Sequence, residues 1–292
     1  MKTNSKYRGI FFIMLAAFFF SCMNVCVRMS GEVPTIQKSF FRNIVAFAIA
    51  SYLLLREGHG FRPAHAKNWP WLLARATFGT VGLLANFYAV DHLMLSDASM
   101  LNKMAPFFAV IASYFLLKEK INPIQALTLV GAFVGALFII RPTLSNMDLV
   151  PSLVGFFGGF CAGTAYTLVR CLGQRGERSS IIVLMFSGFS CLVALPFLIF
   201  DYYPMTMEQT LWLLGAGLTA AGGQFSVTAA YTNAPAREIS VYDYSQVIFS
   251  AILGFFIFQD IPDLFSFIGY ALIIGMAVLS FCYNNRRALK TA

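Results

Sequence analysis

Two charged residues stand inside long apolar segments of this sequence, where a charge needs a chemical reason. Lys103 lies about two helical turns into one such segment, and Asp243 lies about one turn into another. A charge at the centre of a membrane-spanning helix costs about 3 kcal/mol on insertion scales, which makes both residues candidates for function. A carboxyl group in a dry site retains its proton more readily than in water, so Asp243 could exchange a proton near neutral pH or bind an ammonium group. The structural alternatives are that Lys103 snorkels to the interface and that either residue pairs with a polar neighbour.

Further polar residues in the apolar segments extend this set. The sequence predicts a binding site that draws on Lys103 and Asp243 together with Asn102, Tyr244, Gln246, Arg42, Asn86, Tyr88, Asn24 and Gln224. Arg75 is instead expected to be an interfacial anchor, because Trp71 lies one turn away. If the helices are straight, Lys103 and Asp243 lie roughly 12 Å apart along the membrane normal, which leaves open whether they touch or bracket a ligand.

The elements that position these residues follow from the composition. Hydrophobic residues make up 58% of the 292-residue chain and charged residues only 12%, against about 25% charged residues in soluble proteins. The net charge of +8 comes from short segments between apolar runs, which is typical of orientation signals and excludes a nucleic-acid-binding patch. An all-α membrane protein is therefore expected, with ten spans over residues 9–29, 35–55, 69–90, 97–117, 123–140, 151–170, 180–200, 209–231, 238–258 and 262–282.

The loop charges predict the orientation of these spans. If the N-terminus is cytoplasmic, the cytoplasmic segments hold most of the Lys and Arg residues, and the outer segments hold most of the acids. The positive-inside rule then places both termini in the cytoplasm of a multi-pass protein of the cell (plasma or inner) membrane.

An internal repeat divides the chain into residues 1–145 and 146–292, with five spans in each half. An offset of about 141 residues aligns Leu117-Lys118-Glu119 with Phe258-Gln259-Asp260, and it aligns Asn102-Lys103 with Asp243-Tyr244. Because five is an odd number, the second half must begin on the opposite side of the membrane, which makes the repeat inverted. Inverted repeats are typical of secondary transporters.

The same residues resemble the drug/metabolite transporter superfamily of the EamA type. Phe40-Phe41-Arg42 is similar to that family's Phe-Arg-Phe element, the segment 101–120 resembles its fourth helix, and the segment 244–274 resembles its second-half repeat. The resemblance covers nearly the whole chain and implies the ten-helix inverted fold, but it does not specify a substrate. Two residues depart from the family pattern: Lys103 replaces an apolar residue or Thr and is expected to mark a substrate subgroup, and Asp260 replaces Glu.

These observations favour a secondary transporter that carries a small polar metabolite by alternating access, as a monomer or a homodimer in the lipid bilayer, with proton coupling left open. One internal acid and several internal bases suit an amino acid or a similar zwitterion. The rivals are an exchanger or exporter of an anionic or nucleotide-like metabolite or drug, a channel, and an intramembrane enzyme. No phosphate-binding loop is present, the three His residues lie in loops, and neither a metal site, a cofactor nor a catalytic residue is expected.

Overall fold

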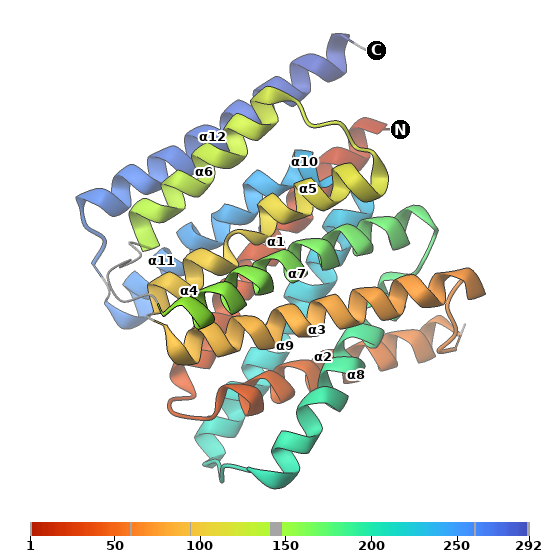
Figure 1. The fold of residues 1–292 in the computed structure, drawn as a ribbon, viewed down its shortest axis with the longest axis vertical. Coiled ribbons are helices and arrows are strands. Elements are labelled where there is room, and N and C mark those ends of the chain that lie inside the picture. Colours follow the sequence, from red (N-terminus) through yellow and green to blue (C-terminus); the bar gives the residue numbers. More distant parts are fainter. Residues whose placement is uncertain (1, 59, 94, 141–147, 260, 291–292) are drawn as a thin grey trace.

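The computed structural model describes residues 2–58, 60–93, 95–140, 148–259 and 261–290, and the regular structure of these ranges is helical (Figure 1). The α-helices are α1 (Lys2–Met29), α2 (Thr35–Glu57), α3 (Trp69–His92), α4 (Leu95–Asn102), α5 (Ala105–Leu117), α6 (Pro123–Ile140), α7 (Leu149–Gln174), α8 (Ser179–Phe200), α9 (Met207–Asn233), α10 (Ala236–Ile239), α11 (Ser245–Phe258) and α12 (Leu264–Lys290). Two short 3-10 helices accompany them, η1 (Ala66–Asn68) and η3 (Ser240–Tyr244).

Eight helical segments of the described residues are long and apolar enough to cross a membrane. They coincide with eight of the ten spans expected from the sequence, including 97–117 and 238–258, each of which is divided between shorter helices. The two remaining expected spans, 69–90 and 209–231, form the long helices α3 and α9, which are not among the eight.

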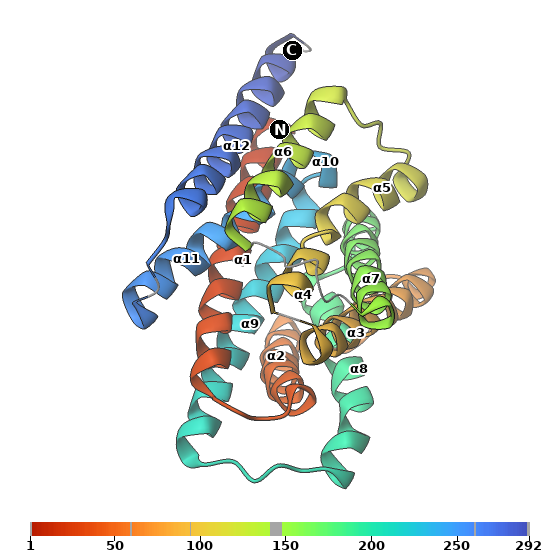
Figure 2. The same cartoon turned by 60° about the vertical axis from the view of Figure 1, so that its left-hand side comes forward.

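The helices of the first half pack against those of the second half in a reciprocal pattern. Helix α1 packs along α9, and α3, the third expected span, packs along α7, the sixth. Helices α2 and α8 form one further close pair, and α6 and α12 form another, visible side by side in Figures 1 and 2. The predicted repeat aligns each span of the first half with the span five places later. Under this alignment the pair α1–α9 corresponds to the pair α7–α3, and the pairs α2–α8 and α6–α12 each correspond to themselves. This is the pattern that a pseudo-two-fold axis between the halves would produce.

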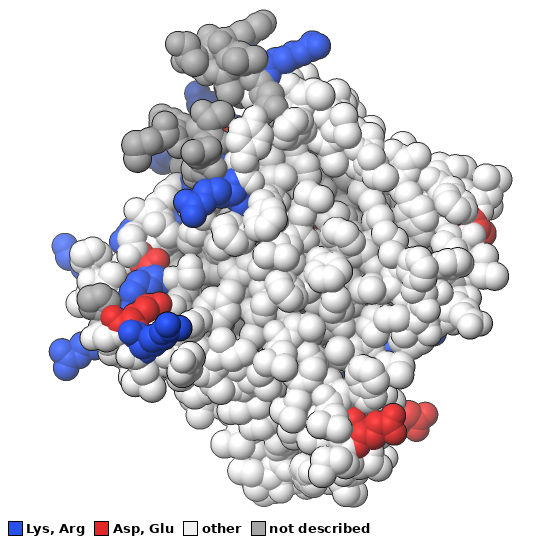
Figure 3. Space-filling model, turned by 180° about the vertical axis from the view of Figure 1, so that it is seen from behind, with Lys and Arg blue, Asp and Glu red and all other residues white. Residues whose placement is uncertain are grey.

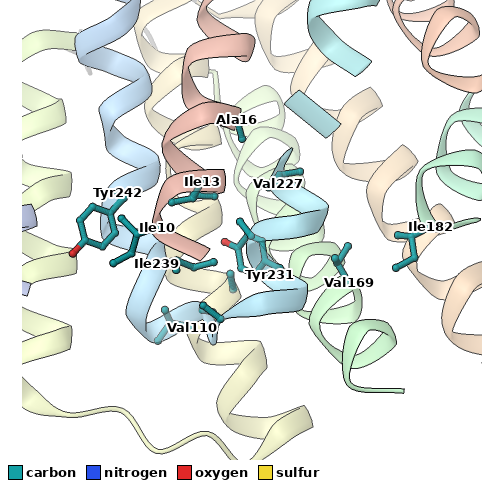
Figure 4. Packing of buried hydrophobic residues seen from close by; sticks show 14 of the residues in the cluster. Ile10, Ile13, Ala16, Val110, Val169, Ile182, Val227, Tyr231, Ile239 and Tyr242 are labelled. Carbon is teal, nitrogen blue, oxygen red and sulfur yellow. The ribbon is translucent and has the colours of Figure 1, made fainter. Parts of the chain in front are cut away.

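The buried core lies where helices of both halves meet (Figure 4). Ile13 of α1, Val169 of α7 and Tyr231 of α9 are each at most 1% exposed and belong to one cluster with Val110 of α5 and Ile239 of α10. The apolar side chains of the outer surface are exposed instead, as expected for a bundle that is surrounded by lipid tails. The core therefore includes residues of both divided segments.

The first break separates α4 from α5 at Lys103 and Met104. Pro106 occupies the first turn of α5, and because proline has no backbone N–H it cannot bond to the carbonyl of Asn102. The chain tightens instead, so that the Met104 N–H donates to the Leu101 carbonyl at 3.1 Å. The sequence predicted one continuous helix here, and the proline was the signal for the break.

The second break lies where the predicted repeat aligns with the first, and there η3 connects α10 to α11. The equivalence extends to the far ends of both segments. Lys118 after α5 has φ 55°, and Gln259 after α11 has φ 57°; these are the non-glycine residues with positive φ in the described ranges. A left-handed conformation is uncommon for such residues, so its occurrence 141 positions apart supports the alignment of the halves.

Glycines on α7 allow the backbone of the first broken segment to come close. A Cβ atom at Gly163 would lie 2.5 Å from the Ala105 carbonyl oxygen and 2.6 Å from the Ala109 nitrogen. A Cβ at Gly159 would lie 2.7 Å from the Leu101 oxygen. Small residues let membrane helices approach each other, and these two glycines do so where α7 crosses the first broken segment.

Replacing Gly163 by alanine is expected to destabilise the protein by about 1–3 kcal/mol, because backbone atoms rather than flexible side chains would have to move. The measurement is the thermal unfolding midpoint of the purified protein in detergent. Gly275→Ala on α12 is the matched control, since no atom lies within 4 Å of a Cβ placed there. Equal midpoints for the two variants would contradict the close packing of α5 on α7.

Candidate functional site

The two helix breaks bring Lys103, Asp243 and Gln246 together in the bundle. The Lys103 Nζ atom donates a hydrogen bond to Gln246 Oε1 at 2.7 Å and lies 3.6 Å from Asp243 Oδ2. The side chains of Lys103 and Asp243 are only 13% and 16% exposed. A contact that the sequence left open is therefore formed, as a largely buried ion pair that joins the two halves.

Backbone carbonyls at and beside the breaks complete this arrangement. Tyr244, which the predicted repeat aligns with Lys103, donates its hydroxyl to the Lys103 carbonyl at 2.9 Å. On the other side, Ser21 of α1 donates to the Gln246 carbonyl at 3.0 Å and accepts a hydrogen bond from Ser250 at 3.1 Å. The face of α11 that carries Gln246 and Ser250 is thus fixed against α1, and the ion pair is held by elements from both halves.

Two tyrosines that the sequence analysis did not select border the ion pair. Tyr166 of α7 stacks on Tyr231 of α9, with ring centroids 5.1 Å apart. The hydroxyls of both tyrosines lie within electrostatic range of the Asp243 carboxylate. A signal for Tyr166 was present, because the offset of 142 that aligns Arg28 with Arg170 also aligns Asn24, a predicted site residue, with Tyr166.

Arg42 and Arg75 lie near the same tyrosine. Each guanidinium is within electrostatic range of the other and of Tyr166. The expectation that Arg75 is an interfacial anchor is wrong, because its side chain is 3% exposed and its guanidinium lies 4.3 Å from the centroid of the Phe186 ring on α8. The cation that stacks on Trp71 is Arg175, at 4.1 Å.

The remaining predicted residues are not seen to join this group. Asn102 and Asn24 are exposed, Asn86 is partly buried on α3, and Tyr88 stacks on His92 at 4.0 Å near the end of that helix. Gln224 is 5% exposed, and its Oε1 atom has no hydrogen-bond partner in the described part of the chain. The roles of these five residues in binding remain predictions. Among them, Gln224 has a buried oxygen that could accept a hydrogen bond from a ligand.

One end of the site is closed by the ends of α7 and α9. Arg170 donates to the Thr232 carbonyl at 2.9 Å, and its Nε atom lies 3.5 Å from Glu119 Oε1. Gly173 lies directly against Thr232, where a Cβ would come within 2.5 Å of the Thr232 methyl group. The ends of α1 and α3, which are equivalent by the repeat, do not pack together in this way within the described residues.

A small pocket lies beside this group rather than inside it. Val110, Gln125, Leu129, Arg237 and Ser240 contribute to its walls, which places it between η3 and the helices α5 and α6. The cluster of charged residues is a closed polar contact in this conformation.

Comparison with known proteins places this geometry in a family. The EamA-like transporter family matches the chain twice, over residues 7–141 and 150–282. The pseudopaline exporter of Pseudomonas aeruginosa (strain UCBPP-PA14) is 31% identical over 268 residues, which cover 91% of this chain and 93% of that protein. A riboflavin transporter of Brucella anthropi is 24% identical, over 89% of this chain and 93% of that protein. A solved crystal structure with 18% identity has the same fold, with a TM-score of 0.81 over 95% of this chain and 98% of that one.

The family match and the named relatives settle the class of the protein. The all-helical architecture with its apolar helices is that of a multi-pass membrane protein, and the relatives are transporters rather than the intramembrane enzyme that the sequence left as a rival. The chain belongs to the EamA-like transporter family of the drug/metabolite transporter superfamily.

Proposed function

We propose that this protein is a secondary active transporter that carries a small polar metabolite across the cell membrane by alternating access. The observation that carries the proposal is the contact of Lys103 with Asp243 and Gln246 at two helix breaks in equivalent positions of the two halves. Broken helices that meet between inverted repeats form the substrate and ion sites of many secondary transporters, because the breaks free polar groups for a ligand.

The site favours a substrate with both an ammonium and an acidic group, such as an amino acid or a similar zwitterion. An ammonium group can replace Lys103 beside the Asp243 carboxylate, and an acidic group can accept the hydrogen bonds that Lys103 then has free. A proton can compete for the same carboxylate, so Asp243 can exchange a proton with the solution when the pair separates. If the Asp243 carboxylate binds the substrate ammonium group and a proton in turn, substrate transport is coupled to the proton gradient.

Alternating access would use two inverted halves, residues 1–145 and 146–292, with ten spans in total. The reciprocal helix packing and the two matches to the family support this division. The ends of α7 and α9 pack together at Arg170 and Thr232, whereas the corresponding ends of α1 and α3 do not. One end state of such a cycle requires this asymmetry. The other end state would separate α7 from α9 and bring α1 and α3 together.

The charge distribution supports cytoplasmic termini. Figure 1 places both chain ends on the same side of the bundle as the connections that follow α2, α5 and α7. Figure 3 shows one face with a wide uncharged belt, with most Lys and Arg residues along the left and upper edges, a few acids among them at the left, and further acids at the right and lower right. Positive charge on one side of an apolar belt is the pattern of the positive-inside rule, and it favours a plasma or inner membrane location.

Export is the direction that the comparisons favour. The relative with 31% identity is named a pseudopaline exporter, and it matches this chain over nearly the full length of both proteins. The second candidate function is therefore export or exchange of an anionic metabolite, for which Lys103 and Arg42 would supply the positive charge.

The proposed function predicts saturable counterflow in liposomes that contain only the purified protein. Amino acids, nucleosides, amines and organic anions are offered as labelled compounds to vesicles loaded with an excess of each unlabelled compound. At least one class should accumulate transiently without ATP, because a carrier exchanges substrate through its two end states. Flux that does not saturate and needs no substrate on the opposite side would contradict a carrier and indicate a channel.

A further inference from the structure

Arg75, which is buried, and Arg42, which is half-buried, have no acidic partner within the described residues. The Nε atom of Arg42 and the Nε and Nη1 atoms of Arg75 are buried and make no hydrogen bond within the described part of the chain. Tyr166 is their shared electrostatic neighbour, and the two guanidinium groups repel each other. Buried arginines are normally paired with a carboxylate or with carbonyl oxygens, because an uncompensated charge in a dry site is strongly unfavourable.

The local packing holds Arg75 in this position. Its Nη1 atom covers Gly79, one turn further along α3, so closely that a Cβ there would overlap it. The side chain therefore runs toward the middle of the helix, away from Trp71 and the near end of α3, where a snorkelling arginine would place its charge. Phe186 supports the other face of the guanidinium at 4.3 Å. The contacts with Gly79 and Phe186 thus hold the Arg75 guanidinium inside the bundle.

The charges of Lys103, Arg42, Arg75 and Asp243 do not balance, and the group that would balance them is an anion. Lys103, Arg42 and Arg75 contribute three positive charges, and Asp243 contributes one negative charge that Lys103 already pairs. The surplus positive charge lies on the two arginines. Guanidinium groups bind carboxylate and phosphate groups with two parallel hydrogen bonds, and Tyr166 can donate a further one from its hydroxyl.

We propose that Arg42, Arg75 and Tyr166 form an anion subsite for a carboxylate or phosphate group of the substrate. The inference rests on the proposed function and narrows it, because the transported metabolite then carries an anionic group in addition to the polar group that binds at Lys103 and Asp243. Acidic metabolites are substrates of this site, and their neutral analogues are poor ligands.

The first test compares pairs of ligands that differ only in the acidic group. Binding of glutamate and glutamine, aspartate and asparagine, and O-phosphoserine and serine is measured by competition and by thermal stabilisation of the protein in nanodiscs. The acidic member of at least one pair should bind at least tenfold more tightly, and Arg42→Met and Arg75→Met should each remove this difference. A larger effect for the phosphate pair than for the carboxylate pairs identifies the group. Arg175→Met is the control, since Arg175 also stacks on an aromatic ring but lies outside the cluster.

The second test needs no ligand. If Arg75 is an unpaired charge that awaits an anion, Arg75→Met should leave the unfolding midpoint of the empty protein unchanged or raise it, because methionine keeps the packing on Phe186 and removes the buried charge. A lower midpoint would show that Arg75 is a structural element and would overturn the subsite.

The outcomes separate this inference from the proposed function. Equal binding of the acidic and neutral members, together with counterflow of either, would refute the anion subsite and leave the transporter intact. Retention of the full acid preference in Arg75→Met would also refute it. Loss of counterflow for every compound class would instead refute the proposed function, whatever the arginine variants do.

Discussion

Replacing Asp243 by asparagine is expected to abolish accumulation driven by a proton gradient. Asparagine has nearly the same shape and keeps a polar oxygen beside Lys103, but it cannot bind and release a proton. With one proton coupled to each substrate molecule, a pH difference of one unit supports about tenfold accumulation, since each 1.4 kcal/mol is a factor of ten. In the variant this ratio should fall to about one. The measurement is the steady-state substrate ratio across liposomes with an imposed pH difference, using the substrate found by counterflow.

Glu57→Gln is the matched control, because Glu57 also pairs with a cation, Arg178 at 3.2 Å, but is more exposed and far from the breaks along the chain. This variant should accumulate substrate as the unmodified protein does. Undiminished accumulation by Asp243→Asn would remove Asp243 from the coupling step. Loss of counterflow as well as of accumulation would assign Asp243 to substrate binding in addition to coupling.

Sequence reasoning located the charged pair but not its contact. The separation of roughly 12 Å assumed straight helices that begin at residues 97 and 238. In the structure α4 begins at Leu95 and α10 begins at Ala236, so Lys103 and Asp243 lie further along their helical segments than assumed. Each extra residue adds about 1.5 Å of depth, or about 2 Å where the chain is a 3-10 helix, and the long lysine side chain spans what remains. The ends of helices are the feature that a sequence pattern predicts least precisely, and the separation of the two charges was overestimated because both helical segments begin earlier than predicted.

The error at Arg75 has a different cause. An arginine one turn from a tryptophan is typical of a membrane interface, and hydropathy alone cannot tell a charge that points to the interface from one that points inward. The direction of the side chain depends on space beside Gly79 and on Phe186 of α8, which is more than 100 residues away in the sequence. Tyr231 was missed for a similar reason, because only the packing of α7 on α9 stacks it on Tyr166.

Neutralising both members of the ion pair is expected to be less harmful to stability than neutralising one. Lys103→Met leaves the Asp243 carboxylate buried without a cation, and Asp243→Asn leaves the lysine without an anion. Breaking a buried pair in this way costs about 3–5 kcal/mol, whereas removing both charges avoids most of that loss. The double variant Lys103→Met/Asp243→Asn should therefore recover about 2 kcal/mol relative to the sum of the single changes, as a coupling energy. Reversible unfolding in mixed micelles measures the four free energies of this cycle.

The exposed pair of Arg178 and Glu57 supplies the comparison, since its atoms are as close, at 3.2 Å, but its side chains are 21% and 38% exposed. Its cycle should give a coupling energy of only about 0–1 kcal/mol, because water screens exposed charges. A value for Lys103 and Asp243 within that same range would mean that the pair is not formed in the folded protein. If the coupling is large and the stable double variant is still inactive in counterflow, the two charges are needed for transport itself. The ion pair between Lys103 and Asp243 then holds the halves together, and substrate and proton must break it in each transport cycle.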